Sequence, residues 1–199
     1  MRLIKAAMAL GLAVFLAGCN FQSETILTVP LGGGDLIAGF GPSDPVRIKI
    51  LSGQDEDVAT VMPQKQGDGT VRYEIVSGTD GSAPAEANKT YLSAKKLTDE
   101  RYIIRYTAVD AKAPSKIVDT QLAFLSIRKG EYIYLAHLED TGILTKVFPV
   151  EAGRPRPTSD GDGFVIETLA QAEAISSYFD SHVAEFSKDK DYQRAVIVN

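Results

Sequence analysis

From residue 46 onwards, apolar and polar positions alternate along the chain with a period of two. In VRIKI, at residues 46–50, apolar side chains alternate with Arg47 and Lys49, and similar alternation recurs at residues 71–76 and 101–108. A strand with one buried face and one solvated face produces this pattern, because successive side chains point to opposite sides of a sheet. The pattern therefore predicts a series of half-buried β-strands.

Short turn-forming stretches separate the apolar runs, at residues 67–70, 79–82, 97–101 and 128–131. The clearest predicted hairpin joins residues 122–127 to residues 132–138 through Lys129 and Gly130. Further strands are predicted at residues 143–150 and 164–167. These segments together predict about eight strands in an antiparallel meander, arranged as a sandwich or a partial barrel.

The period changes to three or four residues after Thr168, where apolar residues form one stripe: Leu169, Ala172, Ile175, Phe179, Val183 and Phe186. This spacing predicts an amphipathic helix over residues 169–187 that packs against the sheet. Thr168 and Gln171 have capping-box spacing, which marks the start of the helix. A last strand is predicted at residues 192–198, so the predicted fold class is α+β, mostly β.

The chain begins with a different pattern. Arg2 and Lys5 precede an uncharged run at residues 6–18. A helix of this length rises only about 20 Å, which is too short to cross the roughly 30 Å hydrocarbon core of a membrane. A positive start, a short apolar centre and small residues at its end instead predict a secretory signal peptide over residues 1–18.

The end of this signal, Leu16-Ala17-Gly18-Cys19, resembles the lipobox of bacterial lipoproteins, in which Leu and two small residues precede Cys. The resemblance implies cleavage between Gly18 and Cys19, and lipidation of Cys19. It also implies a membrane-anchored protein of the bacterial envelope. Asn20 stands where the family's enterobacterial sorting rule has an Asp for retention in the inner membrane, so we expect the outer membrane, facing the periplasm.

Residues 19–45 are rich in glycine and proline, and we interpret them as the lipidated cysteine followed by a tether. Two stretches, at residues 25–31 and 35–40, are too apolar for a fully solvated linker. We therefore expect at least one of them to pack on the domain. Residues 46–199 are predicted to form a single globular domain.

Charge excludes one class of partner. Removal of residues 1–18 takes away Arg2 and Lys5 and no acid, so the formal net charge moves from −5 to −7. A nucleic-acid binder needs a cationic face to displace phosphate counterions. We expect no nucleic-acid partner, and attachment to the membrane through the lipid rather than through surface charge.

Three short motifs suggest chemistry, but each lacks its context. Ser93 and Lys96 have the spacing of the nucleophile and base in penicillin-binding enzymes, yet they lie in a predicted strand, where residues three apart face opposite ways. Residues 160–163 (DGDG) lack the later oxygen ligands of a calcium-binding loop. The acidic run at residues 54–57 is typical of a solvated loop.

The two histidines, His137 and His182, are 45 residues apart and have no Cys or carboxylate at ligand spacing. His182 is expected at the edge of the predicted helix, hydrogen-bonded near the core. We predict no catalytic, cofactor-binding or metal-binding residues, and no cofactor. The sequence favours a protein that is not an enzyme.

Four tyrosines on predicted strands are candidates for the lining of an apolar pocket: Tyr102, Tyr106, Tyr132 and Tyr134. The alternative is an aromatic ladder across neighbouring strands. Three functions follow, in order of preference. The first is a non-enzymatic accessory domain that binds another envelope protein. The second is a carrier of lipid or of a small hydrophobic ligand. The third is a hydrolase.

Overall fold

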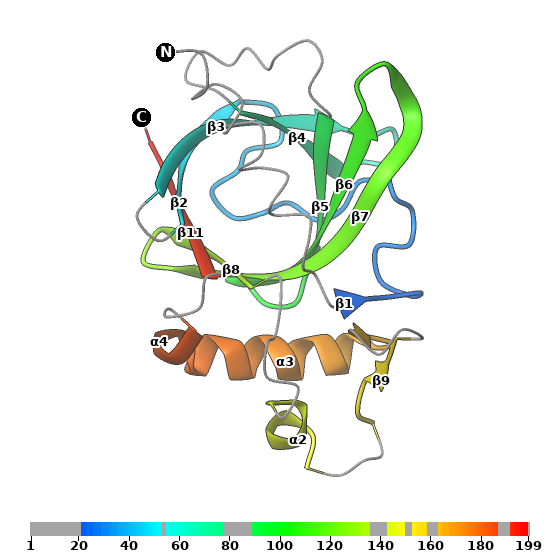
Figure 1. Ribbon diagram of the computed structural model, residues 1–199. Coiled ribbons are helices and arrows are strands. Elements are labelled where there is room, and N and C mark those ends of the chain that lie inside the picture. Colours follow the sequence, from blue (N-terminus) through cyan, green and yellow to red (C-terminus); the bar gives the residue numbers. More distant parts are fainter. Residues whose placement is uncertain are drawn as a thin grey trace, which may run out of the picture.

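The fold is an eight-stranded antiparallel barrel with a helical layer on its outer wall (Figure 1). The computed structural model describes residues 21–52, 55–77, 89–135, 143–149, 153–158, 163–186 and 192–198. Seven barrel strands follow one another as a meander: β2 (Val46–Ser52), β3 (Asp55–Lys65), β4 (Val71–Ser77), β5 (Lys89–Lys96), β6 (Arg101–Asp110), β7 (Ala113–Arg128) and β8 (Glu131–Leu135). The last strand, β11 (Tyr192–Ile197), pairs with both β8 and β2 and closes the barrel.

Alternation along the strands separates two hydrophobic cores. In β6, Tyr102 and Ile104 point into the barrel, whereas Ile103 points outward. The inward set of all eight strands forms the inner core. The outward set of β6, β7 and β8 forms an outer core with the helical layer, because an exposed apolar wall must be covered.

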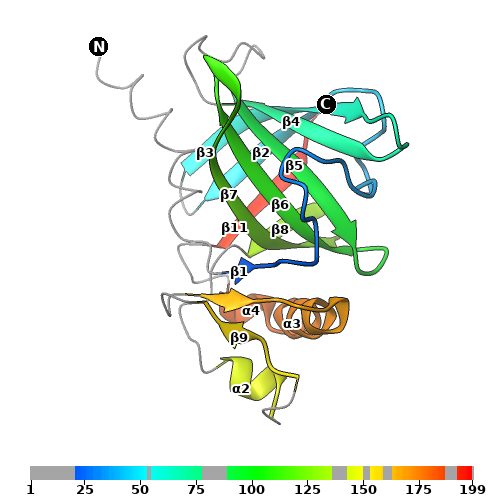
Figure 2. The ribbon, with the colours of Figure 1, turned by 90° about the vertical axis from the view of Figure 1, so that its right-hand side faces the viewer.

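The helical layer lies against one side of the barrel, outside the ring (Figures 1 and 2). Its main element is α3 (Leu169–Ser181), which buries Ala172, Ile175 and Phe179 against the outer wall. The short helix α4 (Val183–Phe186) follows α3 in this layer, whereas α2 (Ile143–Val147) lies on the side of α3 that faces away from the barrel (Figures 1 and 2). Leu144 of α2 belongs to the same buried cluster as Phe179.

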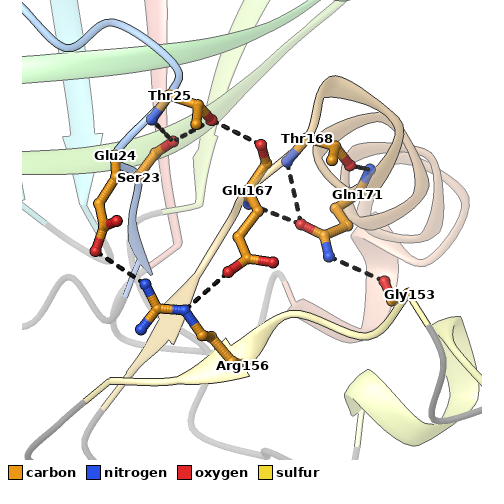
Figure 3. A network of polar contacts seen from close by, with 8 residues as sticks. All are labelled: Ser23, Glu24, Thr25, Gly153, Arg156, Glu167, Thr168 and Gln171. Carbon is orange, nitrogen blue, oxygen red and sulfur yellow. Dashed lines mark hydrogen bonds and ion pairs between the residues drawn. The ribbon is translucent and has the colours of Figure 1, made fainter.

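A small second sheet and a polar network fix the start of α3 (Figure 3). The sheet joins β1 (Phe21–Gln22), β10 (Phe164–Val165) and β9 (Arg156–Pro157) in that order. The Arg156 guanidinium donates to the carboxylates of Glu24, at 2.9 Å, and Glu167, at 2.8 Å. The N-terminal segment is thereby tied to the residues that precede the helix.

The capping box predicted for the helix is confirmed (Figure 3). The Thr168 hydroxyl accepts from the Gln171 backbone N–H, and the Gln171 side chain accepts from the Thr168 N–H. The Gln171 amide also donates to the Gly153 carbonyl at 3.0 Å. One side chain therefore caps the helix and holds the loop beside it.

The predicted mostly-β, antiparallel fold with a C-terminal helix is confirmed, and the barrel is closed rather than partial or split into a sandwich. The hairpin through Lys129 and Gly130 is confirmed, and both residues have positive φ, at 53° and 82°, as a type I′ turn requires. The final strand is also confirmed, as β11. The helix is shorter than predicted because α3 ends before His182.

Two of the predicted strands are wrong or misplaced. Residues 143–150 include the helix α2, because Leu144, Val147 and Phe148 have helical spacing and all reach the outer core. Residues 164–167 give only the two-residue β10, which lies outside the barrel. Strand β3 was not predicted. Its Pro63 interrupts the sequence signal, and it is tolerated because β2 pairs with β3 only as far as Val61.

The segment that precedes β2 enters the barrel. Residues 29–32 run along the outer surface, where Ser93 donates to the Gly32 carbonyl at 2.6 Å and Thr107 donates to the Pro30 carbonyl at 2.7 Å. Gly34 then pairs with Val71 of β4, and the Asp35 N–H donates to Ala94 of β5. The chain therefore passes between β4 and β5, and Ile37 and Phe40 end in the inner core.

Residues 34–40 are called the plug from here on. The sequence interpretation made residues 19–45 a tether and expected at least one apolar stretch to pack on the domain. Residues 35–40 do pack on the domain, because Ile37 and Phe40 are buried in the inner core, whereas Leu36, Ala38 and Gly39 are exposed. Gly34 is required for close approach rather than for flexibility, because a Cβ at this position would lie 2.1 Å from the Ala94 carbonyl oxygen.

Candidate functional site

Three tyrosine hydroxyls hold the plug inside one half of the barrel, called the plugged half. Tyr73 accepts from the Ile37 N–H at 3.1 Å, and Tyr102 accepts from the Ala38 N–H at 3.1 Å. Tyr132 donates to the Ala38 carbonyl at 2.9 Å. These bonds pair backbone groups of Ile37 and Ala38, which have no strand partner there.

Apolar contacts complete the plugged half. The Phe40 ring stacks on Tyr132, with centroids 4.8 Å apart, and meets Tyr73 edge-on at 5.8 Å. Burial raises the pKa of both the Tyr73 and the Tyr132 phenol above the ordinary value. Both groups are therefore neutral at physiological pH, and this half of the interior is filled by protein.

In the other half of the barrel interior, called the far half, the inward strand positions include Ile50, Ile75, Tyr106, Gln121, Tyr134 and Gln193. Tyr106 and Tyr134 pack against the inner core but are only partly buried. Tyr106 is the sixth of ten residues in β6, so its exposure does not come from the fraying of a strand end. Solvent therefore reaches the interior at this level.

Tyr106 and Tyr134 lie side by side in the far half, on strands separated only by β7. Their ring centroids are 6.3 Å apart, tilted by 48°. Burial raises the pKa of Tyr134 to about 12, and a hydrogen bond with the Tyr106 side chain offsets part of this rise. Tyr134 is therefore a neutral phenol that can donate or accept a hydrogen bond.

Each of these tyrosines lies directly opposite a glutamine on the neighbouring strand. Tyr106 pairs with Gln121 of β7, and Tyr134 pairs with Gln193 of β11. Gln121 and Gln193 share the inward face of their strands with Ala123 and Ala195 of the inner core. The two tyrosines and two glutamines thus form one cluster of polar side chains inside an apolar wall.

Both glutamines bury a side-chain oxygen that has no hydrogen-bond partner. The Gln121 amide nitrogen donates to the Asp119 carboxylate at 2.8 Å, and this bond fixes the orientation of the amide because a carboxylate can only accept. Gln121 is only 8% exposed. A hydrogen-bond donor at this position, from water or from a ligand, would satisfy this oxygen.

The charged side chains that face the far half are acidic. Asp57 lies opposite Ile50 on the inward face of β3, and Asp119 lies opposite Ala108 on that of β7. Strands β3 and β7 are four places apart in the ring of eight, so these two carboxylates lie on opposite walls. Outside the projecting hairpin at residues 110–118, no described strand position facing the far half is Lys or Arg.

A polar groove of about 370 Å³ lies between the outer wall and α3. Its lining includes Ser126, which donates to the Asp180 carboxylate at 2.6 Å, and Arg101, which donates to Thr98. These polar groups satisfy one another. The groove therefore has the features of a hydrated contact between the helix and the barrel rather than those of a ligand site.

The structure places all four sequence-predicted tyrosines inside the barrel. It divides them by role: Tyr102 and Tyr132 hold the plug, whereas Tyr106 and Tyr134 line the far half. The four tyrosines do not form an aromatic ladder across neighbouring strands, because β7 lies between β6 and β8. Gln121 and Gln193 were missed, although strand periodicity puts both on an inward face.

The other motifs contribute no site among the described residues. Ser93 lies on β5 and is bonded to Gly32, whereas Lys96 pairs with Asp99 at 2.7 Å. His182 ends α3, and its ring stacks on Tyr178 with centroids 4.0 Å apart, as a helix-edge histidine would. The lipobox, His137, Gln54 and residues 160–162 lie outside the described residues.

Two searches of the described part of the chain give negative findings. No group of three or more His, Cys, Asp or Glu residues there is arranged to hold a metal ion. No helix there is both long enough and apolar enough to cross a membrane.

Comparison of the chain with protein-family models, with curated proteins and with solved structures finds no match. The function is therefore inferred from the site itself.

Proposed function

We propose that this protein binds one small, largely apolar molecule in the far half of its barrel. The observation that carries the proposal is the partial exposure of inward-facing Tyr106 and Tyr134 beside two buried glutamine oxygens without partners. Small ligand sites are mostly apolar with a few placed polar groups, and this set has that composition. The carrier function thus replaces the accessory domain as our first choice.

The size of the barrel supports the proposal. An eight-stranded barrel has an interior that is either filled by side chains or able to hold one small ligand. Here the plug fills one half, where Ile37 and Phe40 lie beside Tyr73, Tyr102 and Tyr132. The interior is thus divided into a structural half and a half available to a ligand.

We also propose that the protein is a lipoprotein of the bacterial envelope, anchored through Cys19, in the outer membrane and facing the periplasm. Phe21, two residues after Cys19, belongs to β1 and is only 2% exposed. Two residues of extended chain span about 7 Å. The lipid would therefore hold the domain directly at the membrane surface, where apolar molecules concentrate.

Native mass spectrometry of residues 20–199 tests the carrier function, since this fragment contains every described element of the fold. The fragment is exported to the periplasm of its host behind a cleavable signal and purified without detergent. We expect a co-purifying molecule of a few hundred daltons. A bare domain that instead cross-links in cells to one envelope protein would favour the accessory function.

Two matched substitutions locate the site. Ile50→Trp adds volume inside the far half, whereas Met62→Trp adds the same side chain at a position that is 40% exposed, outside the barrel. We expect the first variant to lose the bound molecule and the second to retain it. Retention by both variants would place the ligand elsewhere.

A further inference from the structure

We infer that the ligand of the far half is a hydrogen-bond donor that is neutral or positively charged, and that anionic lipids and fatty acids are excluded. This inference rests on the proposed function and names the chemical class of its ligand. It follows from the juxtaposition of unpartnered acceptors and carboxylates in a wall whose described inward positions, outside residues 110–118, carry no Lys or Arg.

The unpartnered polar atoms of the far half are acceptors. The Gln121 side-chain oxygen cannot exchange places with the amide nitrogen, because that nitrogen is held by Asp119 at 2.8 Å. The Gln193 oxygen is also buried without a partner. A ligand that carries an N–H or O–H group satisfies these atoms, whereas a ligand that offers only acceptors leaves them unpaired.

The charge of the far half also favours a neutral or positively charged ligand. Basic side chains at the level of the far half take outward positions, as Lys49 and Lys89 do when they pair with Glu56 and Glu74. A carboxylate or phosphate inside the barrel would lose its hydration and meet Asp57 and Asp119 rather than a counter-charge. A protonated amine would instead find two carboxylates and the faces of Tyr106 and Tyr134.

A matched pair of fluorescent probes tests the inference on residues 20–199. N-phenyl-1-naphthylamine is uncharged and has one N–H donor, and 8-anilino-1-naphthalenesulfonate is the same skeleton with a sulfonate. We expect the amine to bind at least ten-fold more tightly, at a site that Ile50→Trp blocks and Met62→Trp leaves open. Equal or tighter binding of the sulfonate at this site would overturn the inference and leave the proposed function standing.

A substitution separates hydrogen bonding from general hydrophobic binding. Gln121→Leu keeps the approximate volume and removes the acceptor, and Gln22→Leu makes the same change at an exposed position on β1. We expect Gln121→Leu to weaken binding of the amine about ten-fold and Gln22→Leu to leave it unchanged. Unchanged binding by Gln121→Leu would contradict the assigned acceptor role.

A competitor pair tests the charge. We expect 1-naphthylmethylamine to displace the bound probe at concentrations at least ten-fold lower than 1-naphthylacetate requires, and Asp119→Asn to reduce that preference. The reverse order of the competitors would overturn the inference. If neither fluorescent probe binds inside the barrel, the proposed function fails, and the inference fails with it.

Discussion

The two halves of the barrel interior use the same residue type for different purposes. In the plugged half, the hydroxyls of Tyr73, Tyr102 and Tyr132 bond to the backbone of the plug. In the far half, the Tyr106 and Tyr134 side chains bond to each other. A backbone partner is fixed by the fold, whereas a side-chain partner can be exchanged for a ligand.

The two halves also differ in the solvent exposure of their tyrosines. Tyr73 and Tyr102 are at most 1% exposed, but Tyr106 and Tyr134 remain partly exposed at the same type of inward position. Buried area stabilises the plugged half, because removing a contact from a closely packed interior lowers the free energy of unfolding. The far half gives up some of that packing, which is the usual condition for a binding site on a stable scaffold.

The largest expected effect is the loss of packing in the plugged half. Phe40→Ala removes a ring that is 4% exposed and contacts two tyrosines, so it should lower the free energy of unfolding by about 3–5 kcal/mol. Leu36→Ala, at a plug position that is 48% exposed, is the control and should change it far less. Urea denaturation measures the free energy of unfolding of both variants. A change in Phe40→Ala as small as that in Leu36→Ala would show that Phe40 of the plug does not stabilise the barrel.

Alkaline pH should reveal the buried phenols. The pKa of Tyr134 is about 12 in the folded protein, against an ordinary value of 10.0. Between these pH values the unfolded chain releases this proton while the folded chain retains it. Stability should therefore fall with rising pH by up to about 1.4 kcal/mol per pH unit.

The raised pKa values of Tyr73 and Tyr132 act in the same direction. Urea denaturation of the native chain and of Tyr134→Phe, compared at several pH values, isolates the contribution of Tyr134. Below pH 10 the difference between the two proteins should be constant, and it should change as the pH approaches 12. An identical pH dependence in both would contradict the raised pKa of this phenol.

Entry of the plug through the wall should depend on one glycine. Gly34→Ala places a methyl group against the Ala94 carbonyl, so β4 and β5 must separate further, at a cost of about 1–3 kcal/mol. Gly41→Ala is the matched control, since nothing lies within 4 Å of its Cβ position. Thermal unfolding distinguishes them, and a Gly34 variant as stable as the control would disprove the close passage.

The smallest effect compares single hydroxyls in the two halves. Tyr102→Phe removes the acceptor of the part-buried bond from the Ala38 N–H and should cost about 0.5–1.5 kcal/mol. Tyr106→Phe should cost about 0.5 kcal/mol or less, because solvent reaches this position and can replace the lost bond. Equal losses would mean that the far half is as closed as the plugged half.

The sequence by itself determined the local structure where the period was clear. Alternation at residues 46–50, 71–76 and 101–108 predicted strands and their inward faces, and Thr168 with Gln171 predicted the helix start. These signals are local, because strand faces and caps depend on residues only a few positions apart. The antiparallel order of neighbouring strands followed from the short turns between them.

Only the tertiary structure decided how the barrel closes and what fills it. Closure requires β11 to insert between β8 and β2, a pairing of segments about 60 and 145 residues apart that no local period encodes. The path of residues 29–40 was equally hidden, because a glycine that permits close approach and a glycine in a linker look alike in sequence. Nor could sequence separate Tyr102 from Tyr106, since both are inward residues of one strand. Their roles differ because Tyr102 bonds to the backbone of the plug, whereas Tyr106 bonds to the side chain of Tyr134.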